Sequence, residues 1–246
     1  MHYIEQGCLE GPLLVFLHGG GVSGWMWDKQ VDYFTDYHCL IPTLQGHGIR
    51  GGESSFSIME NALEIIELIN EKKNGRAVNI VGFSIGAQIT LEILNLAPNL
   101  VNRALINSAL VIPMKITNLF IAPSIRLTAP LIKNRAFSKI QAKQLYIDDL
   151  YFERYYQDSM KMKSSTLIAM LRENLSYRLP GTQIETTTRV LITVGEKEKG
   201  VMRKSAVKIA EYYSTSSLVV IPQVGHGISF AQPEGFNQLV DDWLRE

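Results

Sequence analysis

The sequence predicts an α/β fold built on a doubly wound, mostly parallel sheet. Short runs of apolar residues alternate along the chain with segments of helical periodicity. Runs such as Leu13–Leu17 show no polar alternation, which is typical of a strand buried on both faces of a parallel sheet. The chain of 246 residues is long enough for one large domain of this class.

The apolar runs and the helical patterns follow one another in a regular order. Strands are expected at residues 13–17, 38–41, 78–81, 103–107, 190–194 and 218–221. Helices are expected near residues 27–34, from 57 to about 70, and at 85–96, 205–213 and 230–243. Ser57 and Glu60 have the spacing of a capping box at the start of the second of these helices.

The strand pattern stops between residues 113 and 186. Pro113, Pro123 and Pro130 are expected to separate short helical pieces there. We therefore expect a core made of residues 1–112 and 187–246, with residues 113–186 inserted as a helical cap or lid over the carboxyl edge of the sheet.

Composition excludes several classes of function. Lys plus Arg and Asp plus Glu both number 24, so the formal charge of zero argues against a nucleic-acid partner. Cys8 and Cys39 make no disulfide framework, and Cys39 is expected to be buried. The first residues do not resemble a signal peptide and no apolar run could span a membrane, so a cytoplasmic location is expected. The five histidines lack metal-ligand spacing, and no metal or cofactor is expected.

The chemistry is expected at the turn after the third predicted strand. There the sequence reads Gly-Phe-Ser-Ile-Gly over residues 82–86, and a helical pattern follows at once. This order is typical of a nucleophile elbow, a strained strand-to-helix turn that exposes the Ser84 hydroxyl. Gly82 and Gly86 allow strand and helix to pass closely because neither has a β-carbon.

Two further loops leave the carboxyl ends of predicted strands and carry an acid and a histidine. Glu198 follows the strand at 190–194, and His226 follows the strand at 218–221. A serine hydroxyl needs an imidazole to take its proton, and the imidazole needs a carboxylate to fix its tautomer. We therefore predict Ser84, Glu198 and His226 as a catalytic triad, with Glu196 as a rival for the acid. The backbone N–H groups of Gly20 and Ile85 are the predicted oxyanion donors.

Taken together, these motifs resemble the α/β-hydrolase superfamily, and most closely its small, capped, esterase-like branch. The order serine, acid, histidine is that of this family. The resemblance implies that the helical insertion follows the sixth family strand. It rests on five segments in order: residues 18–21 with 23–27, 46–48, 82–86, 195–198 and 225–227.

The sequence departs from the family pattern at three places. Glu198 stands where Asp is usual, and Thr43 and Gln45 replace charged residues in the loop before Gly46–Gly48, so a neutral contact in place of an ion pair is expected there. The chain also begins at what resembles the second or third family strand, so an edge strand is expected to be missing.

The resemblance implies a serine hydrolase that cleaves a small, partly hydrophobic carboxylic ester. The same triad would also serve C–C bond, thioester or lactone hydrolysis, or peptidase action. A lyase of the hydroxynitrile type would carry a lysine near His226, but Gly227–Ser229 follow it. From another class, the fold could bind a ligand with a vestigial triad. The motifs specify neither a substrate-binding residue nor an oligomeric state.

The insertion and its approach are rich in positive charge. No Asp or Glu occurs between Ile93 and Ile147, where seven basic residues lie: Arg103, Lys115, Arg126, Lys133, Arg135, Lys139 and Lys143. One interpretation is a solvated surface balanced by Asp148, Asp149 and Glu153. The alternatives are an acidic substrate drawn to the site or loose contact with an anionic membrane surface.

Overall fold

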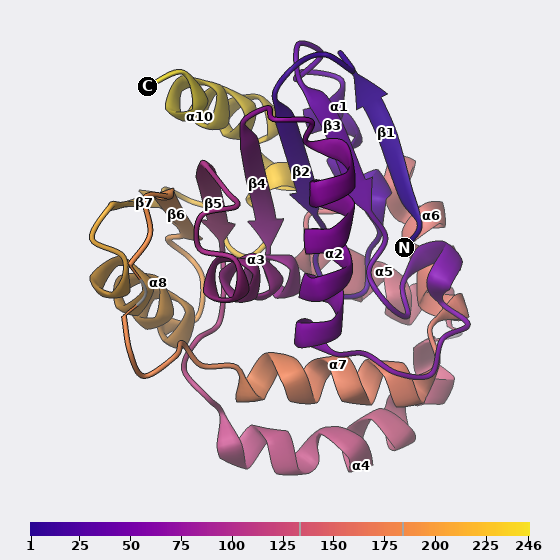
Figure 1. The fold of residues 1–246 in the computed structure, drawn as a ribbon. Helices are drawn as coiled ribbons and strands as arrows, with labels where there is room; N and C mark the ends of the chain where they lie inside the picture. Colours follow the sequence, from indigo (N-terminus) through magenta and orange to yellow (C-terminus); the bar gives the residue numbers. More distant parts are fainter. Residues whose placement is uncertain (133, 184) are drawn as a thin grey trace.

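A seven-stranded, mostly parallel sheet forms the centre of the computed structural model, which describes residues 1–132, 134–183 and 185–246 (Figure 1). The strand order is β1-β3-β2-β4-β5-β6-β7, and β1 alone is antiparallel to its neighbour. The strands are β1 Tyr3–Gly7, β2 Leu13–Leu17, β3 His38–Pro42, β4 Val78–Phe83, β5 Arg103–Asn107, β6 Arg189–Gly195 and β7 Ser216–Ile221. The predicted α/β class is confirmed.

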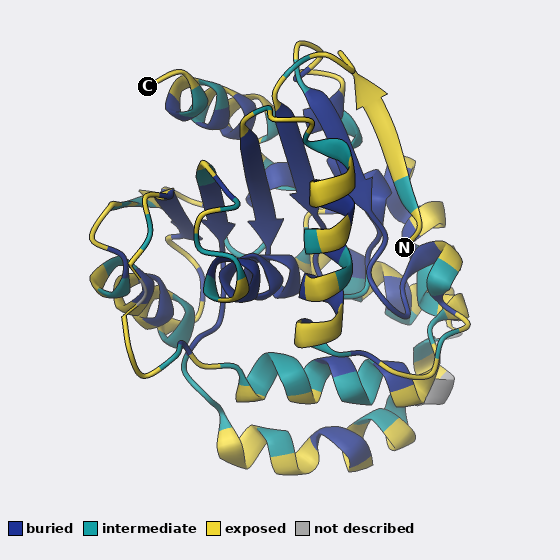
Figure 2. Ribbon diagram, in the orientation of Figure 1, coloured by how far each residue is buried: buried dark blue, intermediate teal, exposed yellow. Residues whose placement is uncertain are grey.

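Helices cover both faces of the sheet because successive strand residues point to opposite sides. Leu13 and Val15 belong to the core on one face, to which α2 (Ile58–Lys72), α3 (Ile85–Leu96) and α8 (Gly200–Tyr212) also contribute. Leu14 and Phe16 pack on the other face with α1 (Asp28–Val31) and α10 (Pro233–Arg245). The central strands β2, β3 and β4 are buried along their whole length, as their apolar sequences predict (Figure 2).

Strand β1 was not among the predicted elements. It lies at the sheet edge, most of its residues are exposed, and it therefore lacks the apolar run that marks the inner strands (Figure 2). Glu5 on β1 is hydrogen-bonded to His38 of β3 (2.7 Å) and forms an ion pair with Lys72 of α2 (3.4 Å). The N-terminal residues thus supply an edge strand that the sequence pattern did not reveal.

Four helices connect β5 to β6. They are α4 Lys115–Ile132, α5 Arg135–Gln144, α6 Asp149–Lys161 and α7 Ser164–Ser176. In Figure 1, α7 crosses below the carboxyl ends of the central strands, and α4 lies outside it. The expectation that Pro123 and Pro130 separate short helices is wrong: α4 is one continuous helix that contains both prolines. Pro123 is exposed, so water can reach the backbone carbonyl that loses its helical partner.

Smaller differences concern where helices begin and end. Ser57 Oγ accepts from the Glu60 amide (3.3 Å), but the Glu60 carboxylate binds Gln45 Nε2 instead of returning to Ser57. The last predicted helix is divided at Gln232 into α9 (Ile228–Ala231) and α10. The segment predicted near 27–34 forms only a 3₁₀ turn, η1 (Gly24–Trp27), followed by the single turn α1.

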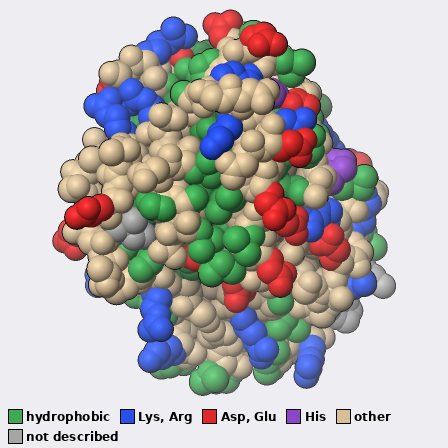
Figure 3. All heavy atoms as spheres, in the orientation of Figure 1, with side chains coloured by type: hydrophobic (Ala, Val, Ile, Leu, Met, Phe, Trp, Pro, Cys, Tyr) green, Lys and Arg blue, Asp and Glu red, His purple; other side chains and the backbone are tan. Residues whose placement is uncertain are grey.

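Charges of both signs are scattered over the face drawn in Figure 3, in keeping with the formal net charge of zero. Cys39 is buried, as expected, and Cys8 is exposed. Burial raises the pKa of the Cys39 thiol to about 12, so this thiol stays protonated. None of the described helices combines the length and the apolar character needed to cross a bilayer.

Candidate active site

The three predicted triad residues meet at the carboxyl edge of the sheet. Parallel pairing aligns the ends of the strands, so that Phe83 of β4 lies opposite Asn107 of β5, and Asn107 opposite Thr193 of β6. Ser84 follows β4 directly. Glu198 lies in the turn after β6, and His226 lies between β7 and α9.

Ser84 occupies a tight turn between β4 and α3. Its backbone has φ 55° and ψ −113°, a conformation that is costly for a residue with a β-carbon. A Cβ at Gly86 would lie 2.4 Å from the Leu17 carbonyl oxygen, and one at Gly82 would lie 2.6 Å from the Gly86 oxygen. The two glycines of the motif are therefore required by the close approach of β2, β4 and α3.

His226 lies between the serine and the acid. Its Nε2 is 3.0 Å from Ser84 Oγ, and its Nδ1 is 3.0 Å from Glu198 Oε2. A carboxylate only accepts, so Nδ1 carries the ring proton and Nε2 is left to accept from the Ser84 hydroxyl. The Glu198 side chain is 2% exposed and the His226 side chain 32% exposed, so one end of the ring is buried and the other faces the cavity.

Glu198 is held by more than the histidine. Its Oε1 accepts a short hydrogen bond from the Ser108 hydroxyl and a longer one (3.3 Å) from the Gly195 amide. Burial alone would raise the pKa of this carboxyl, but the hydrogen bond and charge of His226, with the Ser108 and Gly195 donors, lower it overall. The carboxylate therefore stays ionised at neutral pH.

Ser108 was missed at the level of sequence. It follows β5 immediately, so the rule that ligands and reacting groups gather after parallel strands could have indicated it. Its φ is 57°, a left-handed conformation that turns the hydroxyl toward Glu198.

The rival acid Glu196 lies elsewhere in the same turn. It is exposed, and its Oε2 accepts from the Gln223 amide (2.8 Å). Within the described residues, Glu198 and not Glu196 is the carboxylate in contact with His226.

The predicted oxyanion donors face the same cavity as Ser84. Gly20 follows β2, and Ile85 is the first residue of α3. In the described part of the chain neither amide has an acceptor, so both N–H groups are free to bind a developing negative charge. A Cβ at Gly20 would lie 2.8 Å from Met170 Sδ, so only glycine fits between the sheet and α7 without moving that side chain.

The other two histidines near the site hold loops. His18 Nδ1 donates to the Gly19 carbonyl and Nε2 accepts from the Leu44 amide, while His47 Nδ1 donates to the Gln45 carbonyl. Burial lowers the pKa of His18 to about 3 and that of His47 to about 4. Both rings are neutral at physiological pH.

Thr43 and Gln45, which replace charged residues of the family pattern, do not bind each other. Thr43 Oγ1 lies 3.2 Å from His2 Nδ1, and Gln45 binds the α2 side chains Glu60 and Asn61. An ion pair nevertheless remains in this loop, between Arg50 and Glu64 (2.8 Å).

A pocket of about 150 Å³ opens beside Ser84. Apolar side chains make most of its wall. Its lining residues are Gly20, Phe83, Ser84, Ile85, Leu145, Met170, Leu171, Asn174 and His226. Trp25 and Trp27 are not among them, and both are buried in the core. Helix α7 and the end of α5 thus close the cavity above the sheet.

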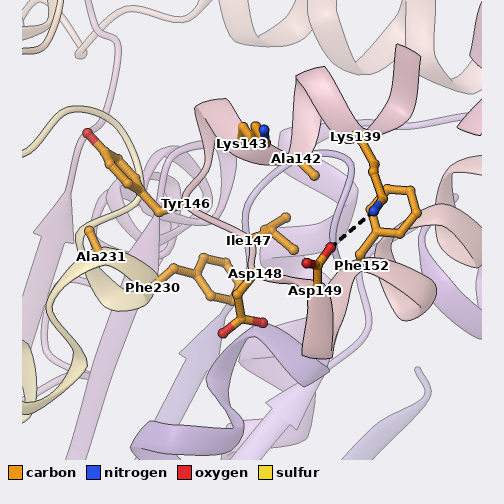
Figure 4. A pocket seen from close by; sticks show the side chains of 10 residues that line it. All are labelled: Lys139, Ala142, Lys143, Tyr146, Ile147, Asp148, Asp149, Phe152, Phe230 and Ala231. Carbon is orange, nitrogen blue, oxygen red and sulfur yellow. Dashed lines mark hydrogen bonds and ion pairs between the residues drawn. The ribbon is translucent and has the colours of Figure 1, made fainter. Parts of the chain in front are cut away.

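A larger cleft of about 580 Å³ lies between α5, α6 and α9 (Figure 4). No triad residue lines it. Lys139 on its wall pairs with Asp149 (3.2 Å), and Arg135 of the same helix pairs with Glu153 (2.7 Å). These pairs favour the interpretation of the basic segment as a surface balanced by neighbouring acids. Lys133, counted in that segment, lies outside the described residues.

The turn between α5 and α6 contacts the loop that carries His226. Tyr146 Oη accepts from the Gly225 amide (2.9 Å), and a Cβ at Gly227 would lie 2.8 Å from the Leu145 carbonyl oxygen. Positive φ occurs at five described non-glycine residues. Four of them surround the site: Ser84, Ser108, Tyr146 and Gln223; the fifth is Asn74.

No cluster of three or more His, Cys, Asp or Glu side chains suited to a metal ion occurs among the described residues.

Comparison with known proteins identifies the fold and its family. Residues 14–239 match the model of the alpha/beta hydrolase family. The (E)-2-((N-methylformamido)methylene)succinate hydrolase of Acinetobacter baylyi is 26% identical, over 99% of this chain and 93% of that protein. The magnesium-chelatase 30 kDa subunit of Rhodobacter capsulatus is also 26% identical, over 98% and 89%. An esterase structure from Exiguobacterium antarcticum superposes with a TM-score of 0.83 at 18% identity, covering 100% and 94%.

Proposed function

The chain belongs to the alpha/beta hydrolase family, and from this premise we propose that it is a serine hydrolase that cleaves a small, partly hydrophobic carboxylic ester. The observation that carries the proposal is the unbroken contact from Ser84 Oγ through His226 to Glu198, with 3.0 Å at each step. Its relatives include a hydrolase, which agrees with hydrolysis as the reaction class.

The proposed reaction begins with attack of Ser84 Oγ on the ester carbonyl carbon. His226 Nε2 takes the hydroxyl proton as the C–O bond forms, and Glu198 stabilises the resulting imidazolium. The carbonyl oxygen becomes an oxyanion and accepts from the N–H groups of Gly20 and Ile85. Each such donor is worth about 3 kcal/mol in the transition state.

The tetrahedral intermediate then expels the alcohol, which receives the proton from His226. A water molecule attacks the acyl-enzyme, again giving its proton to His226, and the carboxylic acid leaves as Ser84 recovers its hydrogen. Each proton transfer passes between Ser84, His226 and the reactants, so no cofactor is invoked.

We also propose that residues 113–186 act as a cap that restricts the substrate. Its helix α7 supplies Met170, Leu171 and Asn174 to the pocket wall, and Leu145 comes from the end of α5. Bonds from α7 to the core support a closed arrangement: Thr166 Oγ1 donates to the Glu53 carbonyl (2.7 Å).

The same triad could cleave thioesters, lactones, C–C bonds or peptides, and a binding protein with a vestigial triad is the alternative from another class. The free oxyanion donors and the correctly oriented histidine favour catalysis over a vestigial site, because a site without chemistry has no need of either.

Covalent labelling tests the proposal. A fluorophosphonate should add once to the folded protein at Ser84, and Ser84→Ala should not react. Ser229→Ala is the matched control: this serine lies three residues after His226, it is buried, and its hydroxyl has no partner in the described structure. Absence of labelling in the folded wild type would refute the hydrolase and favour the binding protein. An ester, thioester, lactone and peptide panel then identifies the bond cleaved.

A further inference from the structure

One polar side chain outside the triad lines the pocket beside Ser84. Asn174, on α7, is that residue, and its neighbours in the wall are Met170, Leu171 and Leu145. A lone amide in an otherwise apolar wall fixes the orientation of a ligand more strongly than the apolar contacts around it. What it can recognise depends on which of its two polar atoms faces the cavity.

A buried glutamine determines the orientation of the Asn174 amide. Gln88 lies on α3 and is 0% exposed. Its Nε2 donates to the carbonyl oxygens of Leu110 (2.6 Å) and Asn174 (3.0 Å), so both of its N–H groups are used. Its Oε1 can only accept, and it lies 3.0 Å from Asn174 Nδ2. The nitrogen of Asn174 is thereby directed at α3.

The oxygen of the same amide is left for the cavity. Within the described residues no donor reaches Asn174 Oδ1, and this atom is not among the buried unpaired ones. Asn174 follows Met170 by one helical turn, so the two side chains lie on the same face of α7, which is the face toward the pocket. The pocket therefore presents a fixed hydrogen-bond acceptor.

This acceptor lies close to the nucleophile. Gln88 lies in the first turn of α3, where its backbone N–H donates to the Ser84 carbonyl oxygen (3.2 Å), and the Asn174 side chain is bonded to the Gln88 side chain. Ser84 and Asn174 line the same small pocket, so a donor that meets Asn174 Oδ1 is expected only a few bonds, about three, from the carbonyl carbon under attack.

The size of the cavity limits the group that enters it. A cavity of 150 Å³ with apolar walls holds a ligand of about the size of benzene. The alcohol of an ester must leave during the reaction, whereas the acyl group stays bonded to Ser84. The small space between Ser84 and α7 suits the part that stays bonded to Ser84.

We propose that the pocket binds a short acyl group of about six non-hydrogen atoms whose hydroxyl or amide N–H donates to Asn174 Oδ1. This inference rests on the proposed function, because it names the substrate class of the same site. Asn174 is then a specificity-determining residue.

The experiment compares two 4-nitrophenyl esters of nearly equal shape, the 3-hydroxybutanoate and the 3-methylbutanoate. One ester carries a hydroxyl group and the other a methyl group on the third carbon of the acyl chain, so that the differing atom is three bonds from the carbonyl carbon. We expect kcat/KM of the wild type to favour the hydroxy ester by about fivefold, the effect of one neutral hydrogen bond. In Asn174→Leu the preference should be reversed, because the hydroxyl then meets an apolar wall.

A matched control is Asn118→Leu. Asn118, on α4, donates to Ser176 Oγ of α7 (2.6 Å) and does not line the pocket, so its loss tests for a general disturbance of α7. The control should keep the wild-type preference. If Asn174→Leu does not fold, inhibition of the wild type by 3-hydroxybutanamide and 3-methylbutanamide gives the same comparison, and the hydroxy amide should bind more tightly.

Cleavage of both esters at equal rates, unchanged in Asn174→Leu, would overturn the specificity and leave the proposed function standing. A donor preference found only in the alcohol part, with 2-hydroxypropyl against 2-methylpropyl butanoate, would overturn the acyl assignment. Failure to cleave any ester, together with no labelling at Ser84, would refute the proposed function itself.

Discussion

Replacement of Glu198 by glutamine is the most informative single change in the proposed triad. The side chain keeps its length and loses its charge. Glu198 accepts from His226 Nδ1 with one carboxylate oxygen (3.0 Å) and from Gly195 N with the other (3.3 Å), whereas the glutamine amide has a single oxygen to accept either bond. If the amide oxygen faces the histidine, the amide N–H₂ meets the Gly195 donor. If the oxygen faces Gly195, an N–H meets Nδ1 and stabilises the tautomer that cannot take the serine proton.

Either orientation also removes the negative charge that stabilises the imidazolium. The side chain of Glu198 is only 2% exposed, so water does not replace the lost interaction. We therefore expect kcat to fall by about 10³-fold or more, which corresponds to about 4 kcal/mol of transition-state stabilisation. The free energy of unfolding should change by less than about 2 kcal/mol, because the desolvation cost of the buried charge disappears with its hydrogen bonds.

The assay is steady-state hydrolysis of 4-nitrophenyl butanoate, with urea unfolding of the same samples. Glu196→Gln is the matched control, since Glu196 accepts from the Gln223 amide and a glutamine oxygen can do the same. We expect a change of less than about threefold there. Similar losses in both variants would refute the assignment of Glu198, and a large loss only in Glu196→Gln would transfer the role.

Three further predictions follow from contacts around the site. Ser108→Ala removes a donor to the ionised Glu198, so the pKa of Glu198 should rise and the acid limb of kcat/KM against pH should move to higher pH. At neutral pH, kcat should be about tenfold lower. An acid limb that does not move would mean that Ser108 only packs against the site. Gly86→Ala should lower the free energy of unfolding by more than about 3 kcal/mol in a urea titration, because the new Cβ lies 2.6 Å from the His18 carbonyl oxygen. His18 and His47 have pKa values lowered from 6.5 to about 3 and about 4, so the unfolded state binds the extra protons and stability present above pH 6.5 is lost as pH falls. Each of the two histidines should lower the free energy of unfolding by about 2 kcal/mol at pH 5, as measured by thermal melts. A free energy of unfolding that stays constant from pH 8 to pH 5 would contradict the burial of both rings in the neutral form.

The inner strands could be predicted because burial leaves a clear pattern in sequence. A strand such as β2 is covered on both faces, so every residue from Leu13 to Leu17 is apolar. Strand β1 could not be predicted in this way, because it lies at the edge and most of its side chains face solvent. What holds β1 in place is its backbone pairing with β3, which no side-chain periodicity records.

The candidate site divides in the same manner. Ser84 and His226 stand in local glycine-rich motifs whose geometry dictates their neighbours, so short segments were enough to indicate them. Asn174 has no such motif. Its place in the pocket wall depends on how α7 packs across α3, and its orientation depends on Gln88, which is 86 positions away in the chain. Contacts of this kind arise from tertiary packing, and the spacing of residue types along the sequence does not indicate them.

The clustering of left-handed backbone around the site has a consequence for engineering this protein. Ser84, Ser108, Tyr146 and Gln223 each adopt a conformation that glycine would adopt at lower cost. A screen for thermal stability would therefore tend to select glycine at these four positions. At Ser84 the change to glycine deletes the proposed nucleophile, and at Ser108 it deletes the hydroxyl that donates to Glu198. Either substitution would therefore raise thermal stability at the expense of kcat. Stabilising substitutions are better sought in α4, whose residues neither line the pocket beside Ser84 nor adopt left-handed backbone in the described structure.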